Sequence, residues 1–225
     1  MTSAYTKFFS AVLLTFIAGN LNDFQFVYIN YLNSIISLVL LGLSKPTQVL
    51  SKDNLPDNLM GFENLCSIYG QMFITSVGLL TTFLTIKNEP WNVEPKRNDG
   101  EYLVEGFTNT AIFLNINIFY VFSVGAFFLS HPFKERIYKN YFLIGWLTIC
   151  LIYNCVLVFN KDGQMSAMSL YELEKEYKGI LFIIIISFSL AMILYEETFV
   201  KRFVRKIESK NEKKMKKRNS MIKAA

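Results

Sequence analysis

Long apolar runs separated by short polar stretches are the dominant feature of this 225-residue chain. Five of the runs approach the roughly 20 residues that an α-helix needs to cross a bilayer core of ~30 Å. They are residues 24–43, 65–86, 107–129, 141–159 and 179–195. The backbone must satisfy its own hydrogen bonds in lipid, so the pattern predicts that each run is a membrane-spanning helix.

A sixth apolar segment, residues 8–18, is too short to span comfortably. Lys7 interrupts it on one side and Asn20 ends it on the other. We interpret it either as the second half of a longer helix whose beginning is absent, or as a helix in which Lys7 faces protein. The predicted fold is therefore an all-α, multi-pass transmembrane bundle of about six segments, the first of them a partial helix.

Charge is concentrated outside the apolar runs and predicts how the chain is organised. We expect residues 1–198 to form one transmembrane domain and residues 199–225 to form a basic, disordered cytosolic tail. With the tail in the cytosol, the positive-inside rule places the loops 44–64 and 130–140 on the same side. The acid-rich loops 87–106 and 160–178 then lie on the other side.

The expected partners of this layout are the lipid bilayer and, for the basic tail, anionic lipid. A nucleic acid is not an expected partner, because the tail has little aromatic interleaving beyond Phe199 and Phe203. The chain is therefore predicted to be an integral, multi-pass membrane protein.

Residues typical of soluble active sites are scarce. The single histidine, His131, lies beside Pro132 in a predicted loop and is interpreted as a surface residue. The three cysteines, Cys66, Cys150 and Cys155, have neither metal-site nor CxxC spacing. The sequence contains no nucleotide-binding motif. We therefore predict no catalytic residue, no metal site and no cofactor within these 225 residues.

Polar residues inside the apolar runs are the better candidates for function. Asp23 and Gln25 lie where a short turn leads into the apolar run at residues 24–43. The favoured interpretation is that Asp23 caps a helix at the water interface. The alternative is that it faces a partner or a pathway, because intramembrane polar groups are costly. Asn30 and Ser34 continue a polar face from Asp23 at helical spacing, which favours protein or cavity contact.

Two further groups of polar residues have simpler interpretations. The asparagines of the apolar run at residues 107–129 are expected to form interhelical hydrogen bonds rather than to bind a ligand. They are Asn109, Asn115 and Asn117. Glu196 and Glu197 close the last run, and we expect them to be solvated at the cytosolic interface.

Four short stretches occur in an order that resembles a known family. They are Asn-Leu-Asn-Asp-Phe-Gln-Phe at 20–26, Glu-Pro-Trp at 89–91, Thr-Asn-Thr followed by Ala-Ile-Phe at 108–113, and Pro-Phe-Lys at 132–134 with Tyr138 and Asn140. Together they resemble the C-terminal membrane region of type V P-type ATPases, specifically the subgroup associated with polyamine transport. The first stretch is similar to that family's Asn-Leu-x-Asp-x-Gln-Phe turn between its fifth and sixth helices. The resemblance covers nearly all of the chain except the basic tail.

The resemblance implies a ten-helix transport domain whose fifth helix would begin before Met1. It also implies an actuator, a phosphorylated aspartate and a nucleotide domain as further partners in the pump. The family's Asp-Lys-Thr-Gly-Thr phosphorylation motif is absent from these 225 residues. ATP and magnesium are therefore expected only for an intact pump, and enzymatic activity of this chain stays an open question. The resemblance points to an endosomal, lysosomal or vacuolar membrane.

Carried over by position, Asp23 and Gln25 match the sixth-helix pattern, and an anionic Asp23 would attract a cation or polyamine. Two positions depart from the family. Asn30 stands where the family has a second acid, and Lys7 aligns with a glutamine. The candidate substrate-binding residues are therefore Lys7, Asp23, Gln25 and Asn30, and the identity of the substrate stays open.

Three functional interpretations follow. In the first, the chain is part of an ATP-driven cation or polyamine pump. In the second, it is a stand-alone, non-catalytic membrane protein such as a scaffold or assembly partner. In the third, it is an unrelated six-pass channel or carrier. It is disfavoured because the sequence shows no internal repeat and no pore loop.

Overall fold

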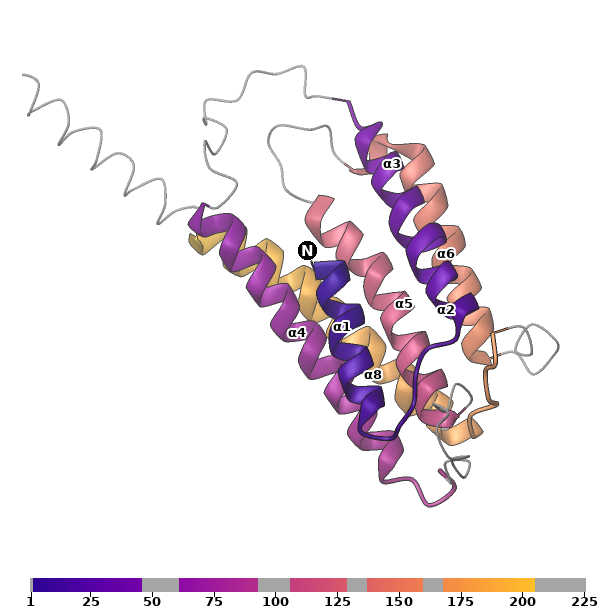
Figure 1. Cartoon of the computed structure of the whole chain (residues 1–225). Coiled ribbons are helices and arrows are strands. Elements are labelled where there is room, and N and C mark those ends of the chain that lie inside the picture. Colours follow the sequence, from indigo (N-terminus) through magenta and orange to yellow (C-terminus); the bar gives the residue numbers. More distant parts are fainter. Residues whose placement is uncertain (1, 46–60, 93–105, 129–136, 160–167, 205–225) are drawn as a thin grey trace, which may run out of the picture.

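The chain folds as an all-α, multi-pass helical bundle (Figure 1). The computed structural model describes residues 2–45, 61–92, 106–128, 137–159 and 168–204. The helices are α1 (Thr2–Thr15), α2 (Asp23–Val27), η1 (Tyr28–Ile35), α3 (Ile36–Gly42), α4 (Phe62–Lys87), α5 (Phe107–Phe128), η2 (Ile137–Lys139), α6 (Tyr141–Phe159), α8 (Lys175–Leu194) and η3 (Tyr195–Val204). His131 and the basic tail after residue 204 lie outside the described residues.

Five helices are long and apolar enough to cross a membrane. One of them is continuous through α2, η1 and α3, and another runs from α8 into η3. The predicted runs agree closely with these spans. The run predicted at 141–159 is α6 itself, and the run predicted at 107–129 ends one residue later than α5. Apolar length alone therefore located the spans.

The first helix differs most from its prediction. It occupies Thr2–Thr15 rather than residues 8–18. It ends early because Ala18 adopts a positive φ of 53° and the Gly19 amide donates to the Leu14 carbonyl at 2.8 Å, as at a left-handed helix terminus. It begins early because polar residues such as Thr6 bond within the helix, the Thr6 hydroxyl reaching the Thr2 carbonyl at 2.9 Å.

The last helix is also longer than predicted. Its π-helical segment η3 continues to Val204, past the domain boundary expected at residue 198. Side-chain bonds along the helix support this extension. One of them joins Lys201 to Glu197 at 2.8 Å, one turn apart.

Helix α5 is the centre of the bundle. In its most apolar stretch 67% of the residues are buried within the protein, compared with 28% for α6. Helices α1, α4, α6 and α8 surround it (Figure 1). Ile112, Phe113 and Ile116 are completely buried. A polar side chain on α5 therefore has to find its partner on another helix.

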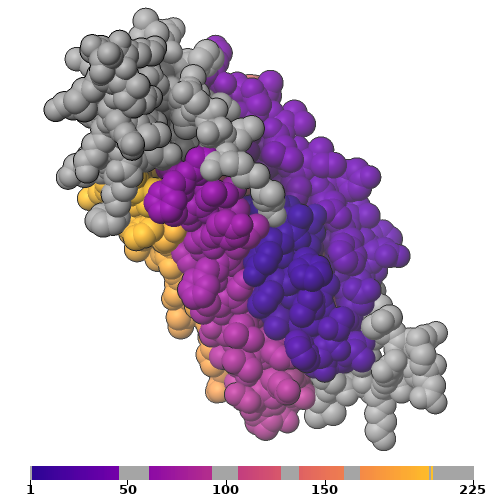
Figure 2. Space-filling model, turned by 60° about the vertical axis from the view of Figure 1, so that its left-hand side comes forward, coloured from indigo at the N-terminus to yellow at the C-terminus, as the bar shows by residue number. Residues whose placement is uncertain are grey.

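Helix α1 lies at the surface, between α4 and the helix formed by η1 and α3 (Figure 2). Its inner face buries Thr6, Ser10 and Leu14, and its outer face exposes Phe8. Lys7 lies beside the inner face. Its position therefore matches the interpretation in which Lys7 faces protein.

Successive spans run in opposite directions, so the bundle has two polar ends (Figure 1). Asn140, before α6, donates to the Leu40 carbonyl at 2.8 Å and to the Ser44 hydroxyl at 2.9 Å, which joins two elements at one end. At the opposite end, Asn92 donates to the Ile86 carbonyl at 3.0 Å. Among the described residues, that opposite end carries the larger number of acids. These are Asp23, Glu89, Glu172, Glu174 and Glu176.

Candidate functional site

A side-chain contact between α1 and η1 joins two of the predicted site residues. The Lys7 ammonium donates a hydrogen bond to Asn30 Oδ1. Both side chains are half-buried, and they are 23 positions apart in the sequence. An ammonium group can only donate, so it requires an acceptor such as the Asn30 carbonyl inside a bundle. The contact places one positive charge between the two helices.

The helix that carries Asn30 is π-helical from Tyr28 to Ile35. The Ile36 amide donates to the Tyr31 carbonyl, five residues earlier, and the Ser34 hydroxyl donates to the Ile29 carbonyl at 3.1 Å. π-Helical turns are rare and are frequent at functional sites, because the extra residue redirects side chains. Here the segment supplies Asn30 and Asn33 to the interior of the bundle.

Asn33 links η1 to the central helix. Its Nδ2 donates to Asn117 Oδ1 at 2.8 Å, and Asn117 in turn donates to the Phe113 carbonyl at 3.0 Å. Asn33 Oδ1 is buried and has no hydrogen-bond partner within the described part of the chain. The amide pair therefore leaves one acceptor oxygen available beside the Lys7–Asn30 contact.

A cavity of about 520 Å³ opens among α1, η1, α3, α4, α5 and α8. No charged side chain is among the residues that line it, and its accessible lining is mainly apolar. Eight of the sixteen lining residues carry a hydroxyl group. The Tyr120 hydroxyl donates to Ser3 across it. The hydroxyl-bearing lining residues are Thr2, Ser3, Thr6, Ser34, Ser37, Thr75, Tyr120 and Ser123. Such a lining can offer both donors and acceptors to a polar guest.

Gln25 lies at the other end of the same helix and takes part in a buried cap. The Asn22 side chain accepts from the Phe24 amide, and Gln25 Oε1 accepts from the Asn22 amide at 3.1 Å. Gln25 Nε2 donates to the Met168 carbonyl at 2.9 Å, and the side chain is completely buried. This capping box joins the start of α2 to the segment before α8.

The helix cap itself differs from the prediction. The cap residue is Asn22, one position before Asp23. Asp23 is exposed in the first turn of α2. A carboxylate there interacts favourably with the helix dipole. The structure thus brings Lys7 and Asn30 together and places Asp23 and Gln25 at the acid-rich end.

The asparagines of α5 form interhelical hydrogen bonds, as predicted. Asn115 donates to the Thr82 hydroxyl at 2.6 Å, and Asn109 donates to the Asn20 carbonyl at 3.1 Å. Asn117 is the partner of Asn33 described above. These side chains join α5 to α4, to the turn before α2 and to η1.

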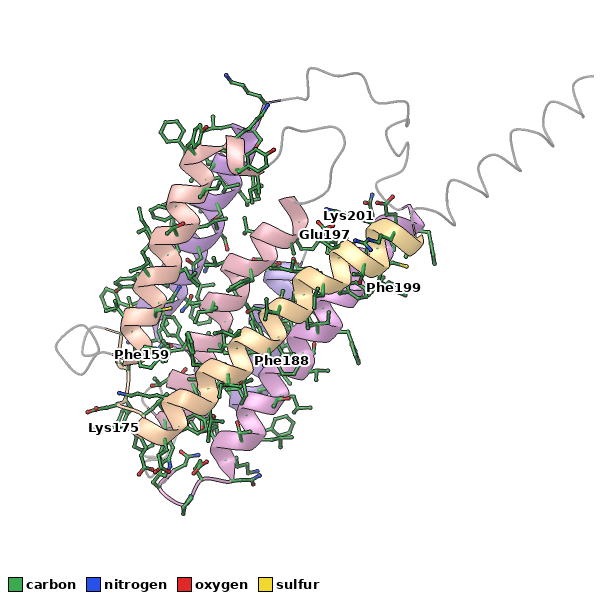
Figure 3. All side chains as sticks on the ribbon, turned by 180° about the vertical axis from the view of Figure 1, so that it is seen from behind. Phe159, Lys175, Phe188, Glu197, Phe199 and Lys201 are labelled. Atoms are coloured by element: carbon green, nitrogen blue, oxygen red, sulfur yellow. The ribbon has the colours of Figure 1, made fainter. Side chains whose placement is uncertain are left out.

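A buried carboxylate was missed by sequence reasoning. Glu196 was expected to be solvated, but only 4% of it is exposed. The Ser67 hydroxyl donates to Glu196 Oε2 at 2.8 Å from α4. The prediction was wrong because the next residue, Glu197, is the one that faces outward, where it pairs with Lys201 (Figure 3). A usable signal was the polar stripe Ser67, Gln71 and Thr75, which lie four residues apart on α4.

The described residues contain no group of three His, Cys, Asp or Glu side chains that could hold a metal ion. The arrangement offers amide oxygens, hydroxyls and one ammonium within a bundle of membrane helices. Such groups suit recognition of a polar or charged guest by hydrogen bonds rather than covalent chemistry.

No protein-family model matches the chain. It is 26% identical to the cation-transporting ATPase catp-5 of Caenorhabditis elegans over 201 residues, which is 88% of this chain and 16% of that protein. It is 29% identical to the human polyamine-transporting ATPase 13A2 over 155 residues, 68% of this chain and 13% of that protein. Its homologues are type V P-type ATPases. The vacuolar cation-transporting ATPase YPK9 of Saccharomyces cerevisiae is 23% identical over 64% of this chain and 10% of that protein.

The type V P-type ATPase similarity extends over most of the chain, and the chain spans no more than about a sixth of the length of these relatives. The five spans and the homologues together make it a multi-pass integral membrane protein. Its apolar outer faces are therefore in contact with the lipid bilayer.

Proposed function

We propose that the chain forms the membrane-embedded transport region of an ATP-driven cation transporter, with a polyamine as the candidate cargo. The observation that carries the proposal is the similarity to transport ATPases, which extends over 88% of the chain for the nematode relative. One of those relatives, the human ATPase 13A2, is named as polyamine-transporting.

In this proposal the transported cation passes beside η1. Asn30 and Asn33 offer amide oxygens there, and Ser34 of the same segment lines the cavity. Oxygen acceptors suit an ammonium cargo because each ammonium brings only donors. Asp23 would attract the cation at the acid-rich end of the same helix, and Gln25 would hold that end in place through its cap.

Phosphorylation and nucleotide binding would come from a part of the pump outside these 225 residues. ATP and magnesium would act there. We place the transporter in an endosomal, lysosomal or vacuolar membrane, for which the yeast relative, named as vacuolar, is the support. Binding of the basic tail to anionic lipid stays a prediction about residues outside the described part.

One observation favours the second candidate, a stand-alone, non-catalytic membrane protein that acts as a scaffold or assembly partner. Lys7 places a positive charge against Asn30, where a cation would pass. Like charges repel strongly where the effective dielectric constant is low. A chain specialised for assembly would tolerate this lysine, whereas a cation path would be weakened by it.

The size and phosphorylation of the endogenous protein separate the two candidates. We would immunoprecipitate it with an antibody against this chain and incubate it with radiolabelled ATP, with and without spermine. A product much larger than 26.0 kDa that forms a spermine-sensitive phosphoenzyme would support the pump. A product of about this size that takes no label would overturn the pump and support the stand-alone protein.

A further inference from the structure

Glu196 is an acid within the membrane-spanning part of the last helix, α8 continued by η3. It is 4% exposed and accepts a hydrogen bond from the Ser67 hydroxyl at 2.8 Å. Gln71 Nε2 lies 3.5 Å from the same carboxylate oxygen and donates to the Met192 carbonyl at 3.0 Å. The cluster joins α4 to η3, away from the contact between Lys7 and Asn30. Ionisable groups buried in membrane spans are costly and point to function.

The cluster contains more acceptors than donors. Ser67 supplies one hydroxyl proton, and the Gln71 amide donates to the Met192 carbonyl and, through a long hydrogen bond, to Glu196 Oε2. Gln71 Oε1 is an additional acceptor, is buried, and has no hydrogen-bond partner in the described part of the chain. Gln71 as a whole is 1% exposed. A buried acceptor without a donor is unfavourable, and an added proton would correct the imbalance.

The charged groups around Glu196 include both positive and negative side chains. Lys201 brings a positive charge to this region, and Glu63 on α4 brings a negative one. The Lys201 ammonium also pairs with Glu197 at 2.8 Å, so its charge is shared between two acids. Tyr195 lies nearby and donates to the Cys66 carbonyl at 2.9 Å. Burial removes the water that would stabilise an ionised carboxylate at Glu196. Lys201, which also pairs with Glu197, restores only part of that stabilisation.

The cluster of Ser67, Gln71 and Glu196 lies next to the cavity along α4 and along the helix formed by α8 and η3. The helix changes from α to π at Tyr195, and π-helical turns are frequent at functional sites. Thr75 and Met192 line the cavity of about 520 Å³, and each lies four residues from a member of the cluster. One helical turn therefore separates Gln71 and Glu196 from a space lined by hydroxyl groups.

We propose that Ser67, Gln71 and Glu196 form a proton-binding site in which Glu196 holds the proton at neutral pH. A hydronium ion transfers its proton to a carboxylate oxygen of Glu196 and leaves as water, so an O–H bond forms and nothing is oxidised or reduced. The protonated acid adds a donor to a cluster in which acceptors outnumber donors. The site does not depend on the proposed transport function, because it uses α4 and η3 rather than α1 and η1.

Infrared spectroscopy of the purified chain in phospholipid nanodiscs tests this proposal. Carbon-13 labelling of glutamate separates the carbonyl stretch of a protonated glutamic acid from that of aspartic acid. We expect this band at neutral pH in the wild type and in the Glu197→Gln control, and its loss in Glu196→Gln. Absence of the band from the wild type at neutral pH, or its persistence in Glu196→Gln, would overturn the proposal. Loss of the band on adding sodium or potassium chloride would identify a metal-cation site and would also overturn it.

A second variant keeps the test valid if Glu196→Gln does not fold. Ser67→Ala removes a donor that favours the ionised carboxylate, so the band should persist to higher pH than in the wild type. Ser187→Ala is the matched control, because the Ser187 hydroxyl is exposed and bonds only to the Ile183 carbonyl of its own helix. A titration of the band that is the same in all three proteins would contradict the proposed site.

Discussion

The Lys7 ammonium on α1 donates a hydrogen bond to the side-chain oxygen of Asn30 on η1. These are the two positions at which the sequence departs from the polyamine-transporting pattern it resembles. Their direct contact suggests that the two departures are coupled. A lysine facing a second acid would form an ion pair, whereas a lysine facing an asparagine forms a single charged hydrogen bond. In the proposed transporter, the pair would therefore determine how much positive charge the path beside η1 accepts.

Replacement of Gly70 should disturb the contact between α4 and η3. A β-carbon at Gly70 would lie 2.1 Å from the Tyr195 ring, far closer than atoms can pack. We expect Gly70→Ala to displace the ring, break its hydrogen bond to the Cys66 carbonyl and lower stability by about 1–3 kcal/mol. Thermal unfolding in detergent measures the change.

Gly145→Ala is the control for Gly70→Ala, because nothing lies within 4 Å of a β-carbon at Gly145 in α6. It should be neutral or stabilising by up to ~1 kcal/mol, as alanine favours helix more than glycine does. If the double variant Gly70→Ala with Tyr195→Ala recovers the stability lost in Gly70→Ala, the clash with the Tyr195 ring is confirmed. Equal unfolding temperatures for the two glycine variants would contradict it.

Asn33 should stabilise the contact between η1 and α5. Asn33→Ala removes the 2.8 Å hydrogen bond to Asn117 and leaves the Asn117 oxygen without its donor. Interhelical hydrogen bonds in membranes average about 0.6 kcal/mol and reach about 1.7 kcal/mol, so we expect a loss in that range. Val39→Ala, at an exposed position of the same span, should have a smaller effect. When Asn117 is already replaced by alanine, Asn33→Ala should lower the stability by less than it does in the wild type. An equal loss of stability in both backgrounds would show that the Asn33–Asn117 hydrogen bond is not responsible for it.

Gln25 should matter more for stability than Asp23. Gln25→Ala removes a capping bond and leaves the Met168 carbonyl without its donor, which should cost about 1–2 kcal/mol. Asp23→Asn removes a charge from an exposed first turn and should cost about 0.3–1 kcal/mol. Both values come from unfolding in detergent. A larger loss for Asp23→Asn would show that its carboxylate has a buried partner.

The arrangement of the loops can be checked by cysteine labelling after replacement of Cys66, Cys150 and Cys155 by serine. Cysteines introduced in place of Lys45 and Lys139 should react with a membrane-impermeant maleimide from the cytosolic side. A cysteine in place of Glu174 should react only from the opposite side. Labelling of all three positions from one side would contradict the alternating path of the spans.

The sequence predicted the spans well because lipid imposes a strong requirement on apolar length. Residues 141–159 needed no further information, since that run is predominantly apolar between polar ends and has the highest mean apolar character of the short spans. The first helix was harder, because its polar residues face protein rather than lipid. Tyr5, for example, bonds to Ser76 on α4 at 2.8 Å, which hydropathy cannot show.

The site was predicted less completely than the fold. Lys7 and Asn30 were selected from the family pattern, but their contact depends on how two helices pack. Glu196 was assigned to solvent because it adjoins Glu197 and the basic tail. Which of two neighbouring acids is buried depends on the rotation of η3 against α4, and that rotation is a tertiary property.

Binding of radiolabelled spermine to the purified chain in nanodiscs tests the proposed cation path most directly. The proteins compared are the wild type, Lys7→Gln, the double variant Lys7→Gln with Asn30→Asp, and Lys87→Gln as a control that removes a lysine from the far end of α4. We predict that each change at Lys7 and Asn30 strengthens binding about tenfold, equivalent to ~1.4 kcal/mol, and that the control binds like the wild type. Spermine binding that is undetectable in every protein, or that is the same in all four, would contradict a cation path beside Lys7 and Asn30.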